Sequence, residues 1–349
     1  MRRKTWIILA AIPALLLAGV LAYWQYGISR LRGELDAWIA DRRAAGWKVT
    51  MGQPSSGGWP YAAILTVPNL SLRHAGPDMP GDVRWASASV VLSIPLYQPT
   101  DLTIRLDGPQ HVQVAAAQDM VITGESLLVT VDLLTTRATL PLTLRARGLR
   151  LEPAGGGWHA TAGLLSADME LSETTDPAVP SLRVSLSSEA IGLPGSVRWA
   201  LGPTLSSLSM EAKLSGARPG DRTVHDMAGW AGAWRDNGGS LEISHFAMGW
   251  GPLGITGGAT LALDEELQPM GSGTARLVGF ADALDRLAAG GVMTKSAATA
   301  AKAVLSLLAG SAAGDEPTSV DVPLTLQYRT LSMRQVPLLR LPELDWPHQ

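Results

Sequence analysis

The stretch "VDVPLTLQYR", residues 320–329, shows the pattern that decides the fold of this 349-residue chain. Apolar side chains occupy every second position from Val320 to Tyr328, and polar residues or proline stand between them. Because successive side chains of a β-strand point to opposite faces, this alternation predicts a strand with one apolar and one solvated face. Sheets built from such strands are typically antiparallel.

The same alternation recurs through the middle of the chain, in residues 102–107, 140–145, 182–187 and 208–214. Clusters of glycine and proline, such as "HAGPDMPGD" at 74–82, separate the alternating segments, as turns do. Residues 47–349 are therefore predicted to form a mainly β domain. We expect a large, curved antiparallel sheet of about a dozen strands or more.

A few helices are predicted within the C-terminal part, residues 217–349. Apolar residues at helical spacing mark three segments, residues 223–236, 280–289 and 294–309. The last segment of the chain, residues 336–349, contains three prolines and is expected to run extended over the surface.

The N-terminus, "MRRKTWIILAAIPALLLAGVLAYWQYGISR", has no charge between Lys4 and Arg30. A helix rises about 1.5 Å per residue, so residues 5–26 are long enough to cross a hydrocarbon core of about 30 Å. Tyr23, Trp24 and Tyr26 suit the membrane interface, and the basic residues 1–4 are predicted to stay in the cytoplasm. The chain is therefore predicted to be a single-pass protein of the bacterial inner membrane, with its bulk in the periplasm.

A signal peptide cleaved after Ala22 is the alternative interpretation of this segment. The apolar run is longer than the roughly 7–15 residues of a signal peptide, which favours a retained anchor. Both interpretations export the chain from residue 27 onward. Residues 27–46 show helical spacing and are predicted to form a stalk helix, packed either on its own domain or on a partner.

One short sequence occurs twice, as "MPGDVRWA" at 79–86 and "LPGSVRWA" at 193–200. This echo predicts duplicated β units around residues 47–108 and 140–216, with chance similarity as the alternative. In each copy the arginine and the tryptophan would lie on opposite faces of a strand.

Composition and motifs exclude several classes of function. The net charge of −3 gives no electrostatic case for binding nucleic acid, and the absence of cysteine excludes disulfides and thiolate metal sites. No nucleotide-binding, hydrolase or zinc-protease motif is present, and no two histidines lie within ten residues of each other. We therefore predict no catalytic, cofactor-binding or metal-binding residues, and a protein that is not an enzyme.

Tryptophan is the one side chain that suggests a binding surface. The chain has 12 tryptophans and only 2 phenylalanines, so tryptophan either fills the core or lines an apolar groove. The groove candidates are Trp59, Trp85, Trp199, Trp230 and Trp234.

Several segments resemble a known family. They are "GQP" at 52–54, "GWPY" at 58–61, "GGATLALDEELQPMGSGTARLVG" at 257–279 and "PLTLQYRTLSMRQVPLLRLPEL" at 323–344. Together with the N-terminal anchor, they resemble the alphaproteobacterial domain-of-unknown-function family 2125 and, more distantly, AsmA-like envelope proteins. The resemblance implies an elongated β structure with an apolar groove for lipid, and it transfers no site residues.

Two functions are expected from these observations. The first is binding of lipid or another apolar ligand on the concave face of the sheet, because few helices are available to cover that face. The second is a structural or protein-interaction module of the cell envelope whose apolar face is closed.

Overall fold

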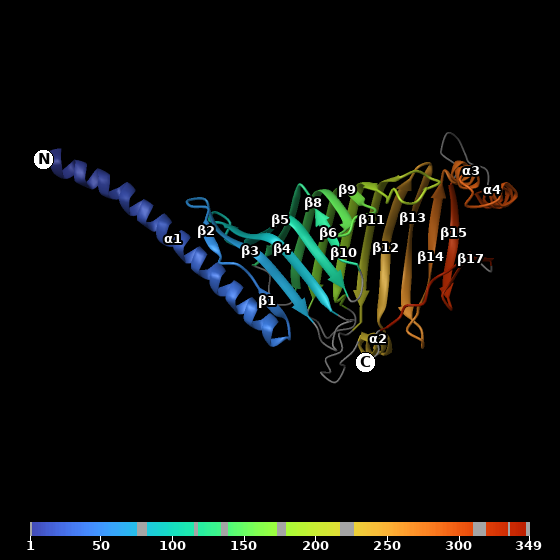
Figure 1. The fold of residues 1–349 in the computed structure, drawn as a ribbon, viewed down its shortest axis with the longest axis horizontal. Coiled ribbons are helices and arrows are strands. Elements are labelled where there is room, and N and C mark those ends of the chain that lie inside the picture. The colour runs from blue at the N-terminus through green and yellow to red at the C-terminus, as the bar shows by residue number, and fades with distance from the viewer. Residues whose placement is uncertain are drawn as a thin grey trace.

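The computed structural model describes residues 2–74, 82–114, 118–133, 139–172, 179–216, 227–309, 319–333 and 336–346. Side chains are described from Ala14 onward, except that of Met227. Figure 1 shows a long sheet with helix α1 (Arg2–Ala44) leaving one end, and helices α3 (Phe280–Ala289) and α4 (Lys295–Ala309) at the other. Helix α2 (Met227–Asp236) lies at the lower edge of the sheet in that view.

Seventeen strands form one sheet within the described residues. Their bounds are β1 (Lys48–Thr50), β2 (Ser55–Gly57), β3 (Ala62–His74), β4 (Val83–Pro95), β5 (Asp101–Val114), β6 (Met120–Thr123), β7 (Ser126–Asp132), β8 (Thr139–Pro153), β9 (Ala160–Ser172), β10 (Leu182–Gly192), β11 (Thr204–Ser215), β12 (Ser240–Trp250), β13 (Leu253–Leu263), β14 (Pro269–Val278), β15 (Ser319–Gln327), β16 (Thr330–Met333) and β17 (Val336–Arg340).

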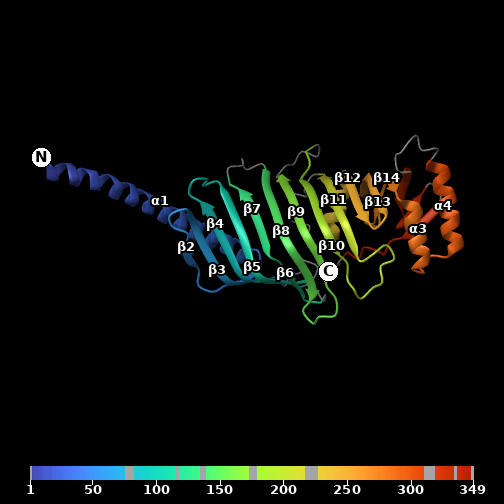
Figure 2. The same ribbon diagram turned by 90° about the horizontal axis from the view of Figure 1, so that it is seen from above.

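The sheet is an antiparallel meander, as the alternation predicts. Strands β1 and β2 both pair with β3, and β6 and β7 both lie between β5 and β8. From β8 onward each strand pairs with the next one along the chain, and β17 is the last. The chain therefore runs once from one end of the molecule to the other, and Figure 2 shows this order from above.

The register aligns small and apolar residues in one row across the strands. This row marks one side of the sheet, which we call the apolar face. From β3 to β15 its successive register partners are Leu65, Leu92, Ile104, Val129, Leu144, Ala167, Leu186, Met210, Phe246, Gly257, Ala275 and Val322. The residues between them point to the other side, the outer face, which carries ion pairs such as Arg145–Asp168 and Arg276–Asp321.

Helix α1 packs its C-terminal half on the apolar face of the first strands. The four residues of α1 that are buried there are Ile28, Leu31, Leu35 and Ile39. Their partners on β3, all at 0 % exposure, are Ala63, Leu65 and Val67. Of the two expected arrangements, the structure shows the helix packed on its own domain, and the helix is continuous from Arg2 to Ala44.

Trp24 fixes α1 to the sheet at the point where the helix leaves it. Its indole Nε1 donates hydrogen bonds to the carbonyl oxygens of Gly57 (3.1 Å) and Ala62 (3.0 Å). Trp24 therefore contacts the protein's own hairpin, whereas Tyr23 and Tyr26 on the same turn are exposed.

The predicted membrane anchor spans residues 5–26, and the side chains of residues 5–13 are not among those described. Within the portion of the chain that the structure does describe, no helix has the length and hydropathy needed to cross a membrane. The anchor, and the alternative cleavage after Ala22, stay predictions.

The two copies of the repeated sequence adopt different structures. Residues 79–81 lie outside the described residues, and Arg84 and Trp85 belong to β4. Residues 193–200 instead form the connection after β10. Leu193 donates its backbone N–H to the carbonyl of Pro203 (2.8 Å), and this bond closes a loop that carries the second motif. The expectation that both copies form strands is wrong, because that loop takes the residues out of the ladder.

The predicted helices are confirmed, with α2 beginning at Met227 while residues 223–226 lie outside the described residues. The strand predicted through Tyr328 ends earlier, at Gln327. Tyr328 (φ 49°) and Arg329 (φ 61°) adopt left-handed conformations that turn the chain into β16, so Tyr328 is exposed. The tail forms the edge strand β17 and then crosses the β13–β14 turn, where Trp346 Nε1 donates to the carbonyl of Leu267 (2.8 Å).

Candidate functional site

The apolar face is covered at its two ends. At the N-terminal end α1 seals the core over β3 and the neighbouring part of β4. At the C-terminal end Phe280 of α3 and Leu305 of α4 pack against Val320 and Val322 of β15. The main helix contacts with the sheet, for the described helices, are with β1, β3, β13 and β15. The middle of the face, from β7 to β12, has no comparable helix contact within the described residues.

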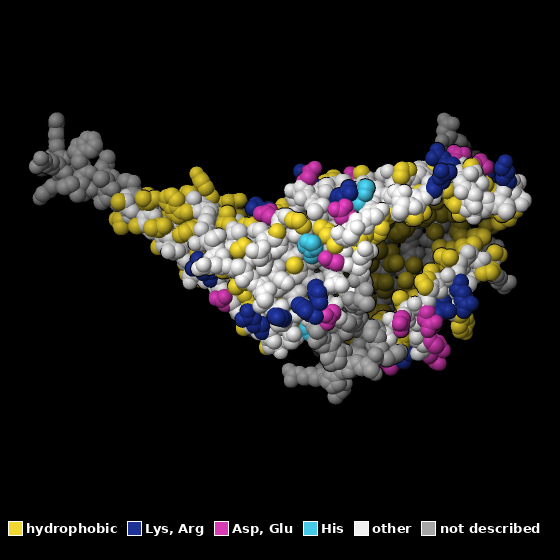
Figure 3. Space-filling view, in the orientation of Figure 1, with side chains coloured by type: hydrophobic (Ala, Val, Ile, Leu, Met, Phe, Trp, Pro, Cys, Tyr) yellow, Lys and Arg dark blue, Asp and Glu magenta, His cyan; other side chains and the backbone are white. Residues whose placement is uncertain are grey.

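Apolar side chains in this middle part are only partly buried. Leu144, Leu186 and Met210 have intermediate exposure, whereas Leu65 in the same row is fully buried. Figure 3 shows a hollow lined by hydrophobic side chains where Figure 1 draws β12 to β14, at the C-terminal end of this middle part. We call the apolar face of β7–β12 the open groove.

A cavity of about 530 Å³ lies where the cover provided by α1 ends. Leu31, Leu35 and Trp38 of α1 line one side of this cavity, and Trp85 of β4 and Ile104 of β5 line the other. Ile104 pairs with Val129 of β7, so this lining residue is the neighbour of the first strand of the open groove in the same row.

A second cavity of about 320 Å³ adjoins the first one toward the N-terminal end of the sheet. The two cavities share three lining residues, which are Arg30 of α1, Ile94 of β4 and Leu133 after β7. Tyr23 and Tyr26 form the far side of the second cavity. Among the described residues, the two adjoining cavities thus extend from the two tyrosines to Ile104, whose register partner Val129 belongs to the open groove.

Exposed aromatic side chains gather at this end of the sheet, and we call them the aromatic rim. They come from α1, from the β2–β3 turn and from the β4–β5 turn. Leu96 donates its backbone N–H to the carbonyl of Tyr61 (2.9 Å), which joins the two turns. The rim consists of Tyr23 (44 % exposed), Tyr26 (62 %), Trp59 (46 %), Tyr61 (79 %) and Tyr97 (83 %).

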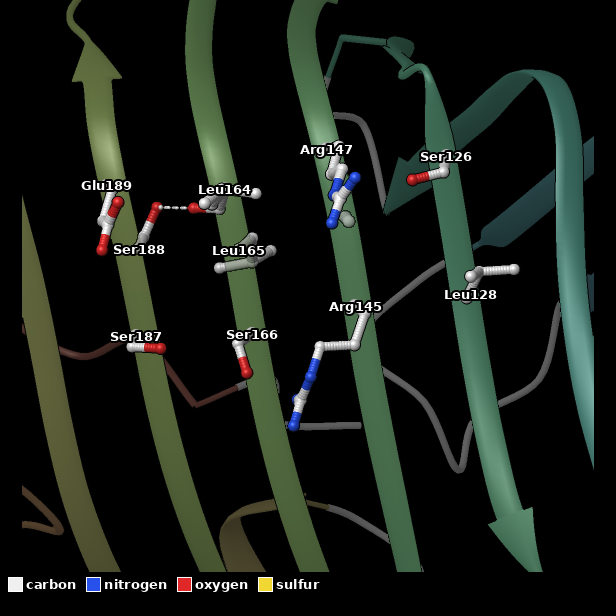
Figure 4. Close-up of a pocket in the computed structure, with 11 residues that line it drawn as sticks. Ser126, Leu128, Arg145, Arg147, Leu164, Leu165, Ser166, Ser187, Ser188 and Glu189 are labelled. Carbon is white, nitrogen blue, oxygen red and sulfur yellow. Dashed lines mark hydrogen bonds between the residues drawn. The ribbon is translucent and has the colours of Figure 1, made fainter. Parts of the chain in front are cut away.

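The outer face has a shallow depression of about 510 Å³ over β7–β10, drawn in Figure 4. Its polar side chains are mostly serines and arginines, and the Ser188 hydroxyl, which Figure 4 shows beside it, donates to the carbonyl of Leu164 (2.9 Å). Among the described residues that line the depression there is no histidine, and Glu189 is the one carboxylate.

The electrostatics of the outer face are those of surface ion pairs. Burial raises the pKa of the Asp168 carboxyl, but hydrogen bonds from Thr143 and Arg145 together lower it by more. The net pKa therefore lies below its usual value. Asp321 also has a lowered pKa because Arg276 donates hydrogen bonds to it. No group of three metal-ligating side chains occurs within the described residues. The geometry therefore supports binding of an apolar molecule better than it supports chemistry.

The structure scatters the five tryptophans named as groove candidates. Trp85 lines the larger cavity and Trp59 belongs to the aromatic rim. Trp199 lies in the β10–β11 loop with its ring 5.8 Å from that of Trp250. Trp230 is 37 % exposed on α2, and Trp234 is buried, with Nε1 donating to the carbonyl of Ser215 (2.9 Å).

Sequence reasoning missed the tyrosines and Arg30 as site residues. Four of the five tyrosines of the chain belong to the aromatic rim. A signal was present, because Tyr23, Tyr26, Arg30 and Glu34 follow one another at spacings of three or four and must share one side of a helix.

Comparison with known proteins identifies a family and no function. The model of a family described as "Uncharacterized protein conserved in bacteria (DUF2125)" matches residues 24–342. The match covers far more than half of the chain, which therefore belongs to this family of uncharacterised bacterial proteins. No curated protein and no solved structure matches.

Proposed function

We propose that this member of the bacterial family is a membrane-anchored periplasmic protein that binds lipid, or another apolar ligand, in the open groove. The observation that carries the proposal is the apolar row, which crosses the sheet and lacks a helix cover from β7 to β12 within the described residues. Large exposed apolar patches on proteins mark binding surfaces.

The size of the open groove suits an acyl chain. Neighbouring strands lie about 4.8 Å apart, so the strands from β7 to β12 present about 24 Å of apolar surface along the row. One leaflet of a bilayer core is about 15 Å thick, which is the depth that one acyl chain spans. Each buried methylene contributes about 0.8 kcal/mol before the entropy lost on binding is subtracted, so a whole chain would be held firmly.

The N-terminal end of the molecule suits a membrane surface. We propose residues 5–26 as a single-pass anchor in the bacterial inner membrane, residues 1–4 in the cytoplasm, residues 27–46 as the stalk and residues 47–349 in the periplasm. The aromatic rim supports this arrangement, because tyrosine and tryptophan favour the headgroup region. Trp24, which lies between the rim residues Tyr23 and Tyr26 in the sequence, hydrogen-bonds α1 to the hairpin at the point where the helix leaves the sheet. The alphaproteobacterial origin and the AsmA-like relation stay predictions.

Lipid analysis of the purified full-length protein tests this function. We expect co-purifying lipid in the wild type, and a loss of about tenfold when Leu186 and Met210, register partners on the apolar face, are both changed to glutamine. The matched control changes Ser187 and Ser209, the adjacent register partners on the outer face, to glutamine and keeps the lipid. Wild-type protein without lipid, or equal loss in both variants, would contradict the proposal.

A structural or protein-interaction module is the second candidate, and one observation favours it. Helix α4 exposes Val304 (47 %) and Leu307 (84 %) at the end of the molecule farthest from α1. This version predicts one stoichiometric protein crosslinked to α4 in intact cells, and its loss in Leu307→Glu. Both candidates are non-enzymatic.

A further inference from the structure

We propose that the ligand is a phospholipid with a net negative headgroup, which enters at the aromatic rim and whose phosphate is held by Arg30. This inference rests on the proposed lipid-binding function and adds to it the headgroup class, the entrance and the residue that recognises the headgroup.

The entrance follows from the two adjoining cavities. The smaller one begins at Tyr23 and Tyr26 and contains Pro99 and Thr100 of the β4–β5 turn. Its inner lining residues Ile94 and Leu133 also line the larger cavity, which is otherwise almost entirely apolar. An amphiphile that enters with its tail first meets polar groups at the rim, then Arg30 and Glu34, and only apolar side chains beyond these two.

Arg30 is placed to hold a headgroup. It is the only Lys, Arg or His among the described residues that line the two cavities, and it lines both. It follows Tyr26 by one helical turn, about 6 Å along the axis. When the aromatic rim lies at the membrane interface, the guanidinium is therefore at the level of the lipid phosphates. Arginine binds phosphate with two parallel hydrogen bonds, which are stronger than those of a neutral donor.

Glu34 is the only carboxylate that lines either cavity among the described residues, and it is the current partner of Arg30. Arg30 Nε lies 3.9 Å from Glu34 Oε1, and the two side chains are 62 % and 74 % exposed. Exposed pairs at this distance contribute little to stability, so a phosphate can take the place of the carboxylate.

The path beyond Arg30 leads to the open groove. From Leu133 and Ile94 the tail passes between α1 and β5, along Trp85 and Ile104. Val129, the register partner of Ile104, is the first residue of the open groove on this row. The lipid thus keeps its headgroup at the membrane end while its tail lies across the strands.

Photocrosslinking in vesicles tests the inference. The full-length protein is reconstituted into vesicles that contain a trace of phosphatidylglycerol or of phosphatidylcholine, each with a photoreactive group in its tail. We expect the anionic lipid to crosslink to peptides of the larger cavity about fivefold more than the zwitterionic lipid, because the choline ammonium of the latter offsets the phosphate charge that attracts Arg30. Arg30→Gln should remove this preference and lower crosslinking of the anionic lipid more than that of phosphatidylcholine.

Arg32→Gln is the matched control, because Arg32 is an exposed arginine on the same helix that lines neither cavity. It should keep the preference for the anionic lipid. An equal preference in wild type and Arg30→Gln overturns the assignment of Arg30 but leaves lipid binding intact. No crosslink from either lipid to the cavity peptides overturns both this inference and the proposed function.

Discussion

The first strands and the middle strands of the sheet carry the same apolar pattern, but their apolar side chains differ in how deeply they are buried. On β3, Leu65 lies under α1 and is 0 % exposed. On β8, Leu144 occupies the same row and is only partly buried, because no described helix packs over it. The alternation of a strand therefore determines which side is apolar, while a separate element determines whether that side becomes a core or a surface.

The largest effect should come from removing packing in the covered region. Leu65→Ala should lower the free energy of unfolding by about 3 kcal/mol, because it leaves a cavity in a sealed core. Leu144→Ala should cost about 1 kcal/mol or less, since its side chain already contacts solvent. Urea unfolding of the detergent-solubilised full-length protein measures both. Equal losses would show that β7–β12 is as well packed as β3.

The contact between α1 and β3 can be weakened at one glycine. A Cβ atom on Gly27 would lie 3.0 Å from the Cβ of Ala63, a fully buried residue on a rigid strand. Gly27→Val should therefore push the helix away and cost about 2 kcal/mol by overpacking. The control is Gly33→Val on the same helix, where a Cβ meets nothing within 4 Å. If the two variants unfold at the same urea concentration, the close approach of α1 does not hold the cover in place.

The hydrogen bonds of Trp24 test the same contact between α1 and the sheet, with a smaller expected effect. Trp24→Phe keeps the ring but removes the donor to the carbonyls of Gly57 and Ala62, which should cost about 1 kcal/mol. Thermal unfolding should show a lower midpoint than for Trp38→Phe, which changes a more exposed tryptophan on the same helix. A larger loss in Trp38→Phe would contradict the role given to Trp24.

The ion pairs of the outer face should contribute least to the free energy of unfolding, and their contribution should depend on pH. The pKa of Asp168 is lowered in the folded protein, so its ion pair stabilises the fold above the pKa of the unfolded chain and this is lost as the pH falls through the folded pKa. Asp168→Asn should cost about 0.5 kcal/mol at pH 7, the value for an exposed pair, and nothing in strong acid. Urea unfolding at both pH values checks this, and a cost that persists in acid would assign the effect to something other than charge.

The strands were predictable because each one is amphipathic by itself. Residues 140–145 and 182–187 alternate so regularly that only one side can be apolar, and the register then aligns Leu144 with Leu186 through Ala167. Local pattern failed where a short loop overrode it. Residues 193–200 share the sequence motif whose other copy enters strand β4. The hydrogen bond between Leu193 and Pro203 nevertheless encloses them in a loop.

The candidate site was much less predictable than the fold. Trp85 and Trp234 are both groove candidates by sequence, yet Trp85 lines the cavity and Trp234 is buried in the core. Neither outcome follows from neighbours in the sequence, since each depends on which helix packs nearby. Arg30 meets Ile94 and Leu133 only after α1 has folded back on β3, so the junction of the two cavities exists in three dimensions alone.

The central claim, that the apolar face of the middle strands holds an acyl chain, can be tested at two adjacent residues. The chain has no cysteine, so Leu186→Cys on the apolar face and Ser187→Cys on the outer face each accept a single small fluorophore. The two labelled full-length proteins are placed in vesicles whose phospholipids carry a quenching spin label in the tail. The account predicts strong quenching at position 186 and little at position 187. Equal quenching at both positions, or none at 186, would contradict it.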